Sequence, residues 1–230
     1  MSPYRSKQRS RSPSRAQVPW TIGENGILEV QTEVSVLPGK IVDLKLGGGD
    51  PASQRQWGLD LMKDFAKKGK LPGFDPHVHQ LVPPRTPFKT GTKEHAEDEG
   101  LHVTVVQGYG FAKEEIPECA ELLAGRKATV QIDTNAVKFV QGRPDNDEAC
   151  GMVFYVAADV DAATKALVDA LRQEIGLPKK SGFFPHVSLA GIAPVGSREL
   201  EDIKELRRQW APPFPEEGFP KEQFELQRNF

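Results

Sequence analysis

Two stretches of the chain, LHVTV at 101–105 and PHVSL at 185–189, share one pattern. In each, a histidine is followed two residues later by a residue with a hydroxyl group, and the positions between and after them are apolar. Such alternation predicts a β-strand with one buried face. Because alternate side chains of a strand point the same way, the histidine and the hydroxyl of each stretch share a face, about 6.5 Å apart. We therefore expect two strands that each present an imidazole and a hydroxyl on one side.

These four side chains, His102, Thr104, His186 and Ser188, suit the cleavage of a phosphodiester without a metal ion. One neutral imidazole can take a proton from an attacking water, and the other, protonated, can give a proton to the departing ribose oxygen. An ordinary histidine pKa of about 6.5 allows both forms near neutral pH. The two hydroxyls would donate hydrogen bonds to the nonbridging phosphate oxygens. Either histidine fits either role.

The pattern of the whole chain predicts an α+β fold. The alternating or apolar runs predict strands at 28–36, 41–46, 101–106, 128–132, 136–140, 152–157, 183–192 and 223–226. Helical spacing and end signals predict helices from about residue 53 to 68 and at 114–124, 161–175 and 197–210. The first two strands should form a hairpin, because Pro38-Gly39 between them is typical of a tight turn.

Two further expectations concern particular segments. Residues 71–100 are rich in Pro, Gly and charge, and we interpret them as a long loop with a short apolar stretch at 79–82. The helix at 161–175 should end at Gly176. Its buried stripe is expected to consist of Ala163, Leu167, Leu171 and Ile175.

Charge is unevenly placed along the chain, which has 30 basic and 32 acidic residues. Met1 to Arg15 holds five basic residues and no acidic one, so residues 16–230 carry a net charge of −7. Met1 to Arg15 has almost no apolar residue to bury, so burial cannot offset the conformational entropy that this segment would lose on folding. We therefore divide the chain into a disordered basic Ser/Arg-rich arm at 1–19 and one domain at 20–230. The arm could contact RNA phosphates, act as a nuclear address, accept phosphate on its serines, or have no essential role.

Membrane, disulfide and metal features are weak in this sequence. No window reaches the roughly 18 apolar residues of a membrane span, and the beginning of the chain lacks the apolar centre of a secretory signal. We expect an intracellular protein, cytoplasmic or nuclear, whose Cys119 and Cys150 are free thiols. His77, His79 and His95 lack a carboxylate or thiolate at ligand spacing, so we expect no metal and no organic cofactor.

The two histidine motifs resemble those of the 2H phosphoesterases, a family named for paired His-x-Thr/Ser motifs. That family includes RNA ligase-like proteins, cyclic phosphodiesterases and 2′,5′-phosphodiesterases. Here the two histidines are 84 residues apart, and the resemblance extends over 101–192 in its order of strand, helix, strands, helix and strand. About a hundred residues precede the first motif, more than in many members, which suggests that the hairpin and loop before 101 were added or rearranged.

The resemblance implies two pseudo-symmetric lobes of mainly antiparallel sheet, with outer helices, around a central cleft. It also implies that His102 and His186 are the acid/base pair and that Thr104 and Ser188 hold the phosphate. Two aromatic residues, Phe184 and Tyr109, could stack on a nucleobase beside these motifs, although core packing is the more common place for such rings.

The expected function is hydrolysis of a ribose 2′ or 3′ phosphodiester, foremost a 2′,3′-cyclic phosphate at an RNA end or on a small nucleotide. The enzymatic alternatives are cleavage of 2′,5′-linked oligoadenylate and trimming of RNA 3′ ends. A nucleotide- or RNA-binding module without catalysis would use the same cleft, and an RNA-processing scaffold would depend on the arm. We expect the protein to act as a monomer, with an RNA end or small nucleotide as its partner.

Overall fold

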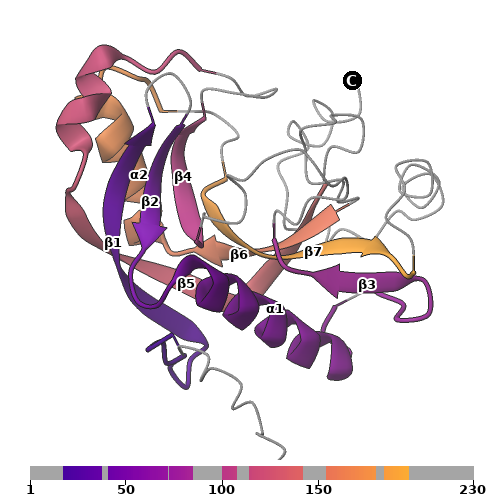
Figure 1. Cartoon of the computed structure of the whole chain (residues 1–230). Coiled ribbons are helices and arrows are strands. Elements are labelled where there is room, and N and C mark those ends of the chain that lie inside the picture. The colour runs from indigo at the N-terminus through magenta and orange to yellow at the C-terminus, as the bar shows by residue number, and fades with distance from the viewer. Residues whose placement is uncertain are drawn as a thin grey trace, which may run out of the picture.

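A curled, antiparallel seven-stranded sheet with helices packed against it forms the body of the protein (Figure 1). The computed structural model describes residues 18–37, 41–71, 73–84, 100–107, 114–141, 154–179 and 184–196. Its strands are β1 (Ile27–Leu37), β2 (Ile41–Leu46), β3 (His79–Val82), β4 (His102–Gln107), β5 (Lys127–Gln141), β6 (Phe154–Val160) and β7 (His186–Pro194). Its helices are α1 (Pro51–Lys67), the 3₁₀ helix η1 (Glu118–Leu123) and α2 (Ala162–Glu174). The predicted α+β class and mainly antiparallel sheet are therefore confirmed.

Apart from β3 and η1, which have no counterpart, the order of strand pair, helix and strand occurs twice among the described elements. The antiparallel pair β1–β2, helix α1 and strand β4 are followed by the antiparallel pair β5–β6, helix α2 and strand β7. The strand order is β3-β7-β6-β5-β1-β2-β4, so β4 pairs with β2 as β7 pairs with β6, and the two sets meet where β1 pairs with β5. The strands that carry the two histidine motifs thus have corresponding places in one continuous sheet. The division into two lobes around a cleft stays a prediction.

Both long helices begin at an acidic residue. The Asp50 carboxylate accepts the Ser53 backbone N–H at 2.9 Å, and the Asp161 carboxylate accepts the Thr164 backbone N–H at 2.8 Å. These bonds satisfy backbone donors that the helix itself leaves unpaired. Hydrogen bonds from Ser53 lower the pKa of Asp50 from its ordinary value. As predicted, α2 stops just before Gly176, which follows its C-cap residue Ile175 and has a φ of 80° that few other residues adopt without strain.

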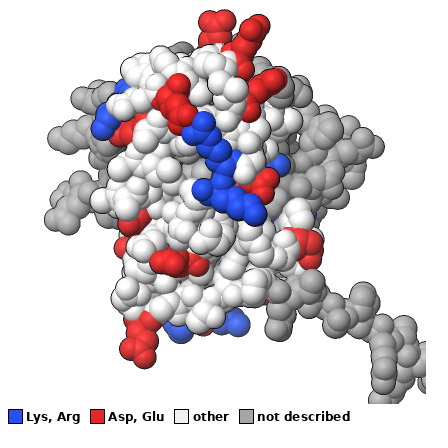
Figure 2. Space-filling model, turned by 90° about the vertical axis from the view of Figure 1, so that its left-hand side faces the viewer, with Lys and Arg blue, Asp and Glu red and all other residues white. Residues whose placement is uncertain are grey.

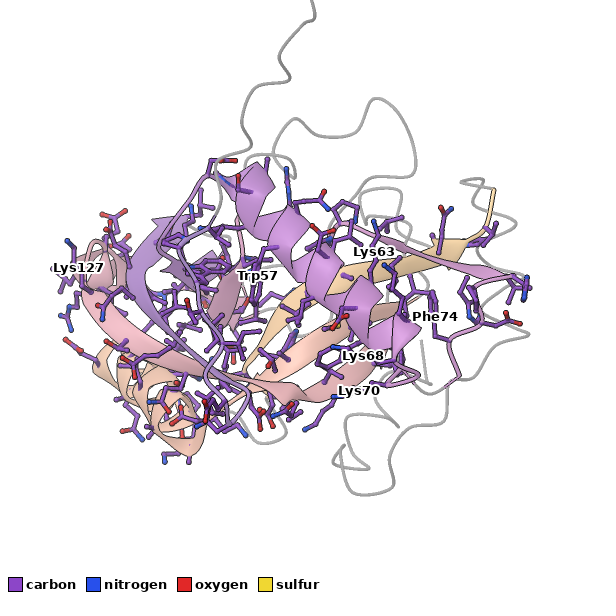
Figure 3. The ribbon with its side chains drawn as sticks, turned by 90° about the horizontal axis from the view of Figure 1, so that it is seen from below. Trp57, Lys63, Lys68, Lys70, Phe74 and Lys127 are labelled. Carbon is purple, nitrogen blue, oxygen red and sulfur yellow. The ribbon has the colours of Figure 1, made fainter. Side chains whose placement is uncertain are left out.

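The core lies on the apolar face of the sheet. Leu59, Met62 and Phe65 from α1 and Val168 and Leu171 from α2 belong to one buried cluster with the apolar residues of the strands. Helix α1 contacts β7 and β3, whereas α2 contacts β4 and β5. Each helix therefore packs on the motif strand of the other set, which ties the two sets together. Figure 3 shows α1 from below, with Lys63, Lys68 and Lys70 toward its C-terminal end.

Four expectations about elements are wrong. Residues 114–124 form only the short helix η1, because Pro117 lacks a backbone N–H and disfavours helical geometry at the residue before it. The strands expected at 128–132 and 136–140 are one strand, β5, with an irregularity between Asp133 and Val137. The Asp133 carboxylate accepts backbone N–H groups within that irregularity, so the chain bends without leaving the sheet.

The remaining two corrections arise from tertiary contacts. The stretch 79–82, expected in a loop, is strand β3, which pairs with β7. In α2, Ala163 is exposed and Thr164 is buried instead, because the Thr164 hydroxyl accepts the Gln131 backbone N–H at 3.0 Å. The expected arm, the helix at 197–210 and the strand at 223–226 lie outside the described residues, apart from 18 and 19. Among the described residues, no helix combines the length and the apolarity needed to cross a membrane.

Gly58 provides a test of the packing of α1 on β7. A Cβ atom at Gly58 would lie 2.6 Å from the Leu189 carbonyl oxygen, so the helix could not keep its place. We predict that Gly58→Ala lowers the free energy of unfolding by about 1–2 kcal/mol, measured by urea denaturation. At an exposed helix position, alanine is more stabilising than glycine by about 1 kcal/mol. The variants Lys63→Gly and Lys63→Ala serve as the control, because the difference between them measures this preference at an exposed position of α1. A stabilised Gly58→Ala protein would contradict the close packing.

Candidate active site

The two motifs lie on two strands that approach each other without pairing. His102 and Thr104 are half-buried residues of β4, and His186 and Ser188 are half-buried residues of β7. Cα atoms of β4 come within 8 Å of Cα atoms of β7, although the two strands are not neighbours in the hydrogen-bonded order. The curl of the sheet thus brings together two strands that are far apart along it (Figure 1).

All four motif side chains share one face of the sheet. Residues paired across antiparallel strands point to the same side, as do residues two apart in one strand. A path of such steps links the two histidines across the sheet. The paired residues along it are His102–Lys45, Lys45–Glu33, Glu33–Lys127, Asp133–Asp159 and Asp159–His186. Lys127 and Asp133 are six residues apart on β5, an even number, so they also point to the same side. This face is the polar one, because Val103 and Val187, which point the other way, are completely buried in the core.

The strand pairing breaks at the same place in both motifs. On β4 the register shifts between the residues paired with Thr104 and Val106, so Val105 is the extra residue. On β7 it shifts between the residues paired with Ser188 and Ala190, so Leu189 is the extra residue. In both cases the extra residue is the third after the histidine. Such irregularities re-aim side chains, and here they follow each hydroxyl residue directly.

The two imidazole rings are held in the same way. Nδ1 of His102 lies 3.1 Å from the Gly100 carbonyl oxygen, and Nδ1 of His186 lies 2.7 Å from the Phe184 carbonyl oxygen. A carbonyl oxygen only accepts hydrogen bonds, so Nδ1 carries the proton in each ring. Nε2 is then the nitrogen that can take or give a proton in chemistry.

Arg172, which the sequence analysis did not single out, supports the irregularity of β4. Its guanidinium is buried and donates to the Val105 carbonyl at 3.0 Å and to both carboxylate oxygens of Glu114 at 2.8 Å. It also donates to the Pro178 carbonyl, on the segment that leads to β7. One side chain of α2 thus fixes the chain beside the first motif and before the second. A basic residue in the last turn of a helix looks like an ordinary surface residue in sequence.

Charged side chains on the motif face differ between β4 and β7. The Asp43 carboxylate, from β2, lies 3.9 Å from Nε2 of His102. Beside β7, Asp159 forms ion pairs with Lys138 at 3.4 Å and Lys165 at 3.0 Å. Asp43 lies outside both histidine motifs, so the motif pattern does not indicate it, although it is the one acidic residue of the strand IVDLKL and shares its face with Lys45.

Of the two predicted stacking residues, only Phe184 lies within the described residues. Its ring is stacked on His186, with centroids 5.5 Å apart and planes 14° apart, and the Lys138 ammonium lies 4.1 Å from its centroid. It therefore lies beside the second motif, as strand alternation predicts. Tyr109 lies outside the described residues, as do 108–113 after β4 and 180–183 before β7.

Two histidines of the expected loop region, His77 and His79, lie within the described residues. Nδ1 of buried His79 accepts the Asp75 backbone N–H at 2.9 Å, and burial lowers the pKa of this histidine, an effect that the Asp75 charge opposes. His77 is exposed, and His95 lies outside the described residues. Within the described part of the chain, no three His, Cys, Asp or Glu side chains are grouped so that they could hold a metal ion.

Comparison of the chain with family models, curated proteins and solved structures gave no match.

Surface charge gives a coarse indication of partners. On the side of the molecule seen in Figure 2, Lys and Arg side chains lie interspersed with Asp and Glu. Among the described residues of that side, the basic side chains do not form the continuous positive surface that favours binding of a long nucleic acid.

Arg172→Met tests the support of the first motif. We predict a loss of about 3 kcal/mol in the free energy of unfolding, because the change leaves the Glu114 carboxylate and two carbonyl groups without their buried donor. The double variant Arg172→Met/Glu114→Gln should lose less than the single variant, since the unpaired charge is gone. The matched control is Arg126→Met, which removes an exposed ion pair with Glu174 and should cost clearly less. Equal losses for both arginines would contradict the supporting role.

Proposed function

We propose that the protein is a metal-independent phosphodiesterase of the 2H phosphoesterase type, acting on a ribose 2′ or 3′ phosphodiester. The preferred substrate is a 2′,3′-cyclic phosphate at an RNA end or on a small nucleotide. His102 and His186 are the acid/base pair, and Thr104 and Ser188 bind the phosphate. Two pseudo-symmetric lobes around a cleft that opens on these residues are part of the proposal.

The observation that carries the proposal is the matched backbone of the two motifs. Each histidine has its Nδ1 bonded to the carbonyl two residues earlier, and each strand has its irregularity at the third residue after the histidine. A single strand histidine is more often structural than catalytic. Here two histidines lie on one polar face, and both have the same Nδ1 contact, the same distance to a strand irregularity and a hydroxyl residue two positions later. A shared chemical task explains these common features better than a structural role. The repeated order of elements around them supports the same conclusion.

The chemistry uses these groups directly. A neutral imidazole takes the proton of a water molecule through Nε2 while the oxygen attacks phosphorus, and an imidazolium protonates the departing ribose oxygen. The hydroxyls of Thr104 and Ser188 donate hydrogen bonds to the nonbridging oxygens, where negative charge increases in the transition state. No other group has to take part in these proton transfers.

The net charge of the domain indicates the size of the substrate. Residues 16–230 carry a net charge of −7, which disfavours a long polyanion spread over the surface. A single phosphate held between two strands is compatible with that charge. A longer RNA would be engaged mainly through the basic arm, whose deletion should then weaken RNA binding and its salt dependence but leave turnover of cyclic mononucleotides unchanged.

Activity assays test the proposal. Purified full-length protein would be incubated in EDTA with 2′,3′-cyclic mononucleotides, 2′,5′-oligoadenylate and cyclic-phosphate-ended RNA, with products followed by phosphorus NMR. We predict that His102→Ala and His186→Ala each reduce kcat/KM by about 10²–10⁴. Thr104→Val and Ser188→Ala should each reduce it by about 10².

The matched control for the hydroxyl variants is Thr129→Val, on β5, whose hydroxyl accepts a hydrogen bond from Gln31. It should retain the activity of the unchanged protein. Wild-type activity in either histidine variant would overturn the proposed site. Tight nucleotide binding without turnover would instead favour the binding module.

A further inference from the structure

The two halves of the candidate site match in backbone but differ in the residues that face the hydroxyls. Across the sheet, Thr104 is paired with Asp43, whereas Ser188 is paired with Ala157. The two motifs therefore have different electrostatic surroundings in corresponding places. Such a difference separates the protonation equilibria of the two imidazoles and so assigns the acid role to one and the base role to the other.

Asp43 places a buried carboxyl group close to His102. Its Oδ2 lies 3.9 Å from Nε2 of the imidazole, and the two side chains are only 5% and 12% exposed. That distance exceeds hydrogen-bond reach, so Asp43 acts on the ring through its charge. Charges in such surroundings interact strongly because little water screens them. Lys45, the residue paired with His102, is exposed, and water screens its opposing charge.

His186 has a different set of neighbours. The acidic residue paired with it, Asp159, is held by two ammonium groups, those of Lys138 and Lys165. Both ammonium groups also lie near the Phe184 ring that stacks on His186, at 4.1 Å and 5.8 Å from its centroid. Because two ammonium groups accompany the one carboxylate paired with His186, this group of charges as a whole opposes a further positive charge on the imidazole.

We propose that Asp43 is a positioning residue that keeps His102 protonated, so that His102 is the general acid and His186 is the general base. This inference rests on the proposed function and assigns the two roles that the motifs leave open. It also explains how a carboxylate can lie beside a phosphate site. Paired with the imidazolium, Asp43 adds no net negative charge where the phosphate binds.

The assigned roles give a balanced hydrolysis step. Nε2 of neutral His186 takes a proton from water, the water oxygen forms a bond to phosphorus, and the bond between phosphorus and one ribose oxygen breaks. That oxygen receives the Nε2 proton of His102. The products are a phosphomonoester and a free ribose hydroxyl, and a proton passes back through solvent from His186 to His102 before the next turnover.

Three elements packed against β4, namely β2, β7 and α2, carry charged or titratable residues. Strand β2 contributes Asp43 and Lys45, and strand β7 contributes His186. Helix α2 contributes Arg172, which bonds to the Val105 carbonyl and Glu114. The Asp43 carboxylate lies 3.9 Å from Nε2 of the imidazole, so its removal should have a large effect on the protonation of His102.

Histidine titration by NMR tests the inference without requiring activity. The Cε1–H signals of the full-length protein would be followed against pH and assigned with His102→Ala and His186→Ala. In the unchanged protein, His102 should have a higher titration midpoint than His186. Asp43→Asn, which keeps the shape and removes the charge, should lower the His102 midpoint by about one pH unit or more and leave that of His186 in place. Asp159→Asn is the matched control and should leave the titration midpoint of His102 unchanged.

The pH profile of activity provides the second readout. Asp43→Asn should move the basic limb of kcat/KM to lower pH, with about a tenfold loss above both midpoints and little loss below them, where His102 is protonated in either protein. A pH-independent loss would indicate a merely structural role and overturn the inference, as would His102 titrating below His186 in the unchanged protein. Absence of turnover on every substrate, with the expected titration order, would refute the proposed function alone.

Discussion

A single buried guanidinium joins the parts of the structure on which the candidate site depends. Arg172 is 1% exposed, and its donors go to the Val105 carbonyl beside the first motif, to the Glu114 carboxylate and to the Pro178 carbonyl before the second motif. A charge this deeply buried is tolerated only when nearly all its donors are used. The positions of α2, of the irregular part of β4 and of the chain leading to β7 are therefore linked. Helix α1 makes the corresponding close contact on β7, where Gly58 meets the Leu189 carbonyl.

The consequence for function is that two distant pieces of sequence present equivalent backbones on one polar face. Alternation along each strand places imidazole and hydroxyl together, and the register across six strands places both pairs on the same side. Equivalence of backbone does not extend to charge. Asp43 lies beside one imidazole, and a cluster of Lys138, Asp159 and Lys165 lies near the other. In the proposed mechanism, this difference assigns opposite proton transfers to the two similar motifs.

Local periodicity was enough to predict the hairpin, the two long helices and both motif strands. It could not predict β3, because a four-residue strand becomes one only by pairing with β7. Nor does alternation reveal an extra residue such as Val105 or Leu189, since an irregularity depends on the partner strand. Arg172 looks like a surface residue until its buried acceptors are known. The shift of the α2 stripe from Ala163 to Thr164 likewise depends on a hydrogen bond to another element.

The central claim is that His102 and His186 act on one phosphate. The most direct test is a titration of the full-length protein with a 2′- or 3′-mononucleotide, following the Cε1–H NMR signals of both histidines at fixed pH. If both imidazoles belong to one site, the two signals should shift together and give one common dissociation constant. Shifts of only one histidine, or two different dissociation constants, would contradict the account.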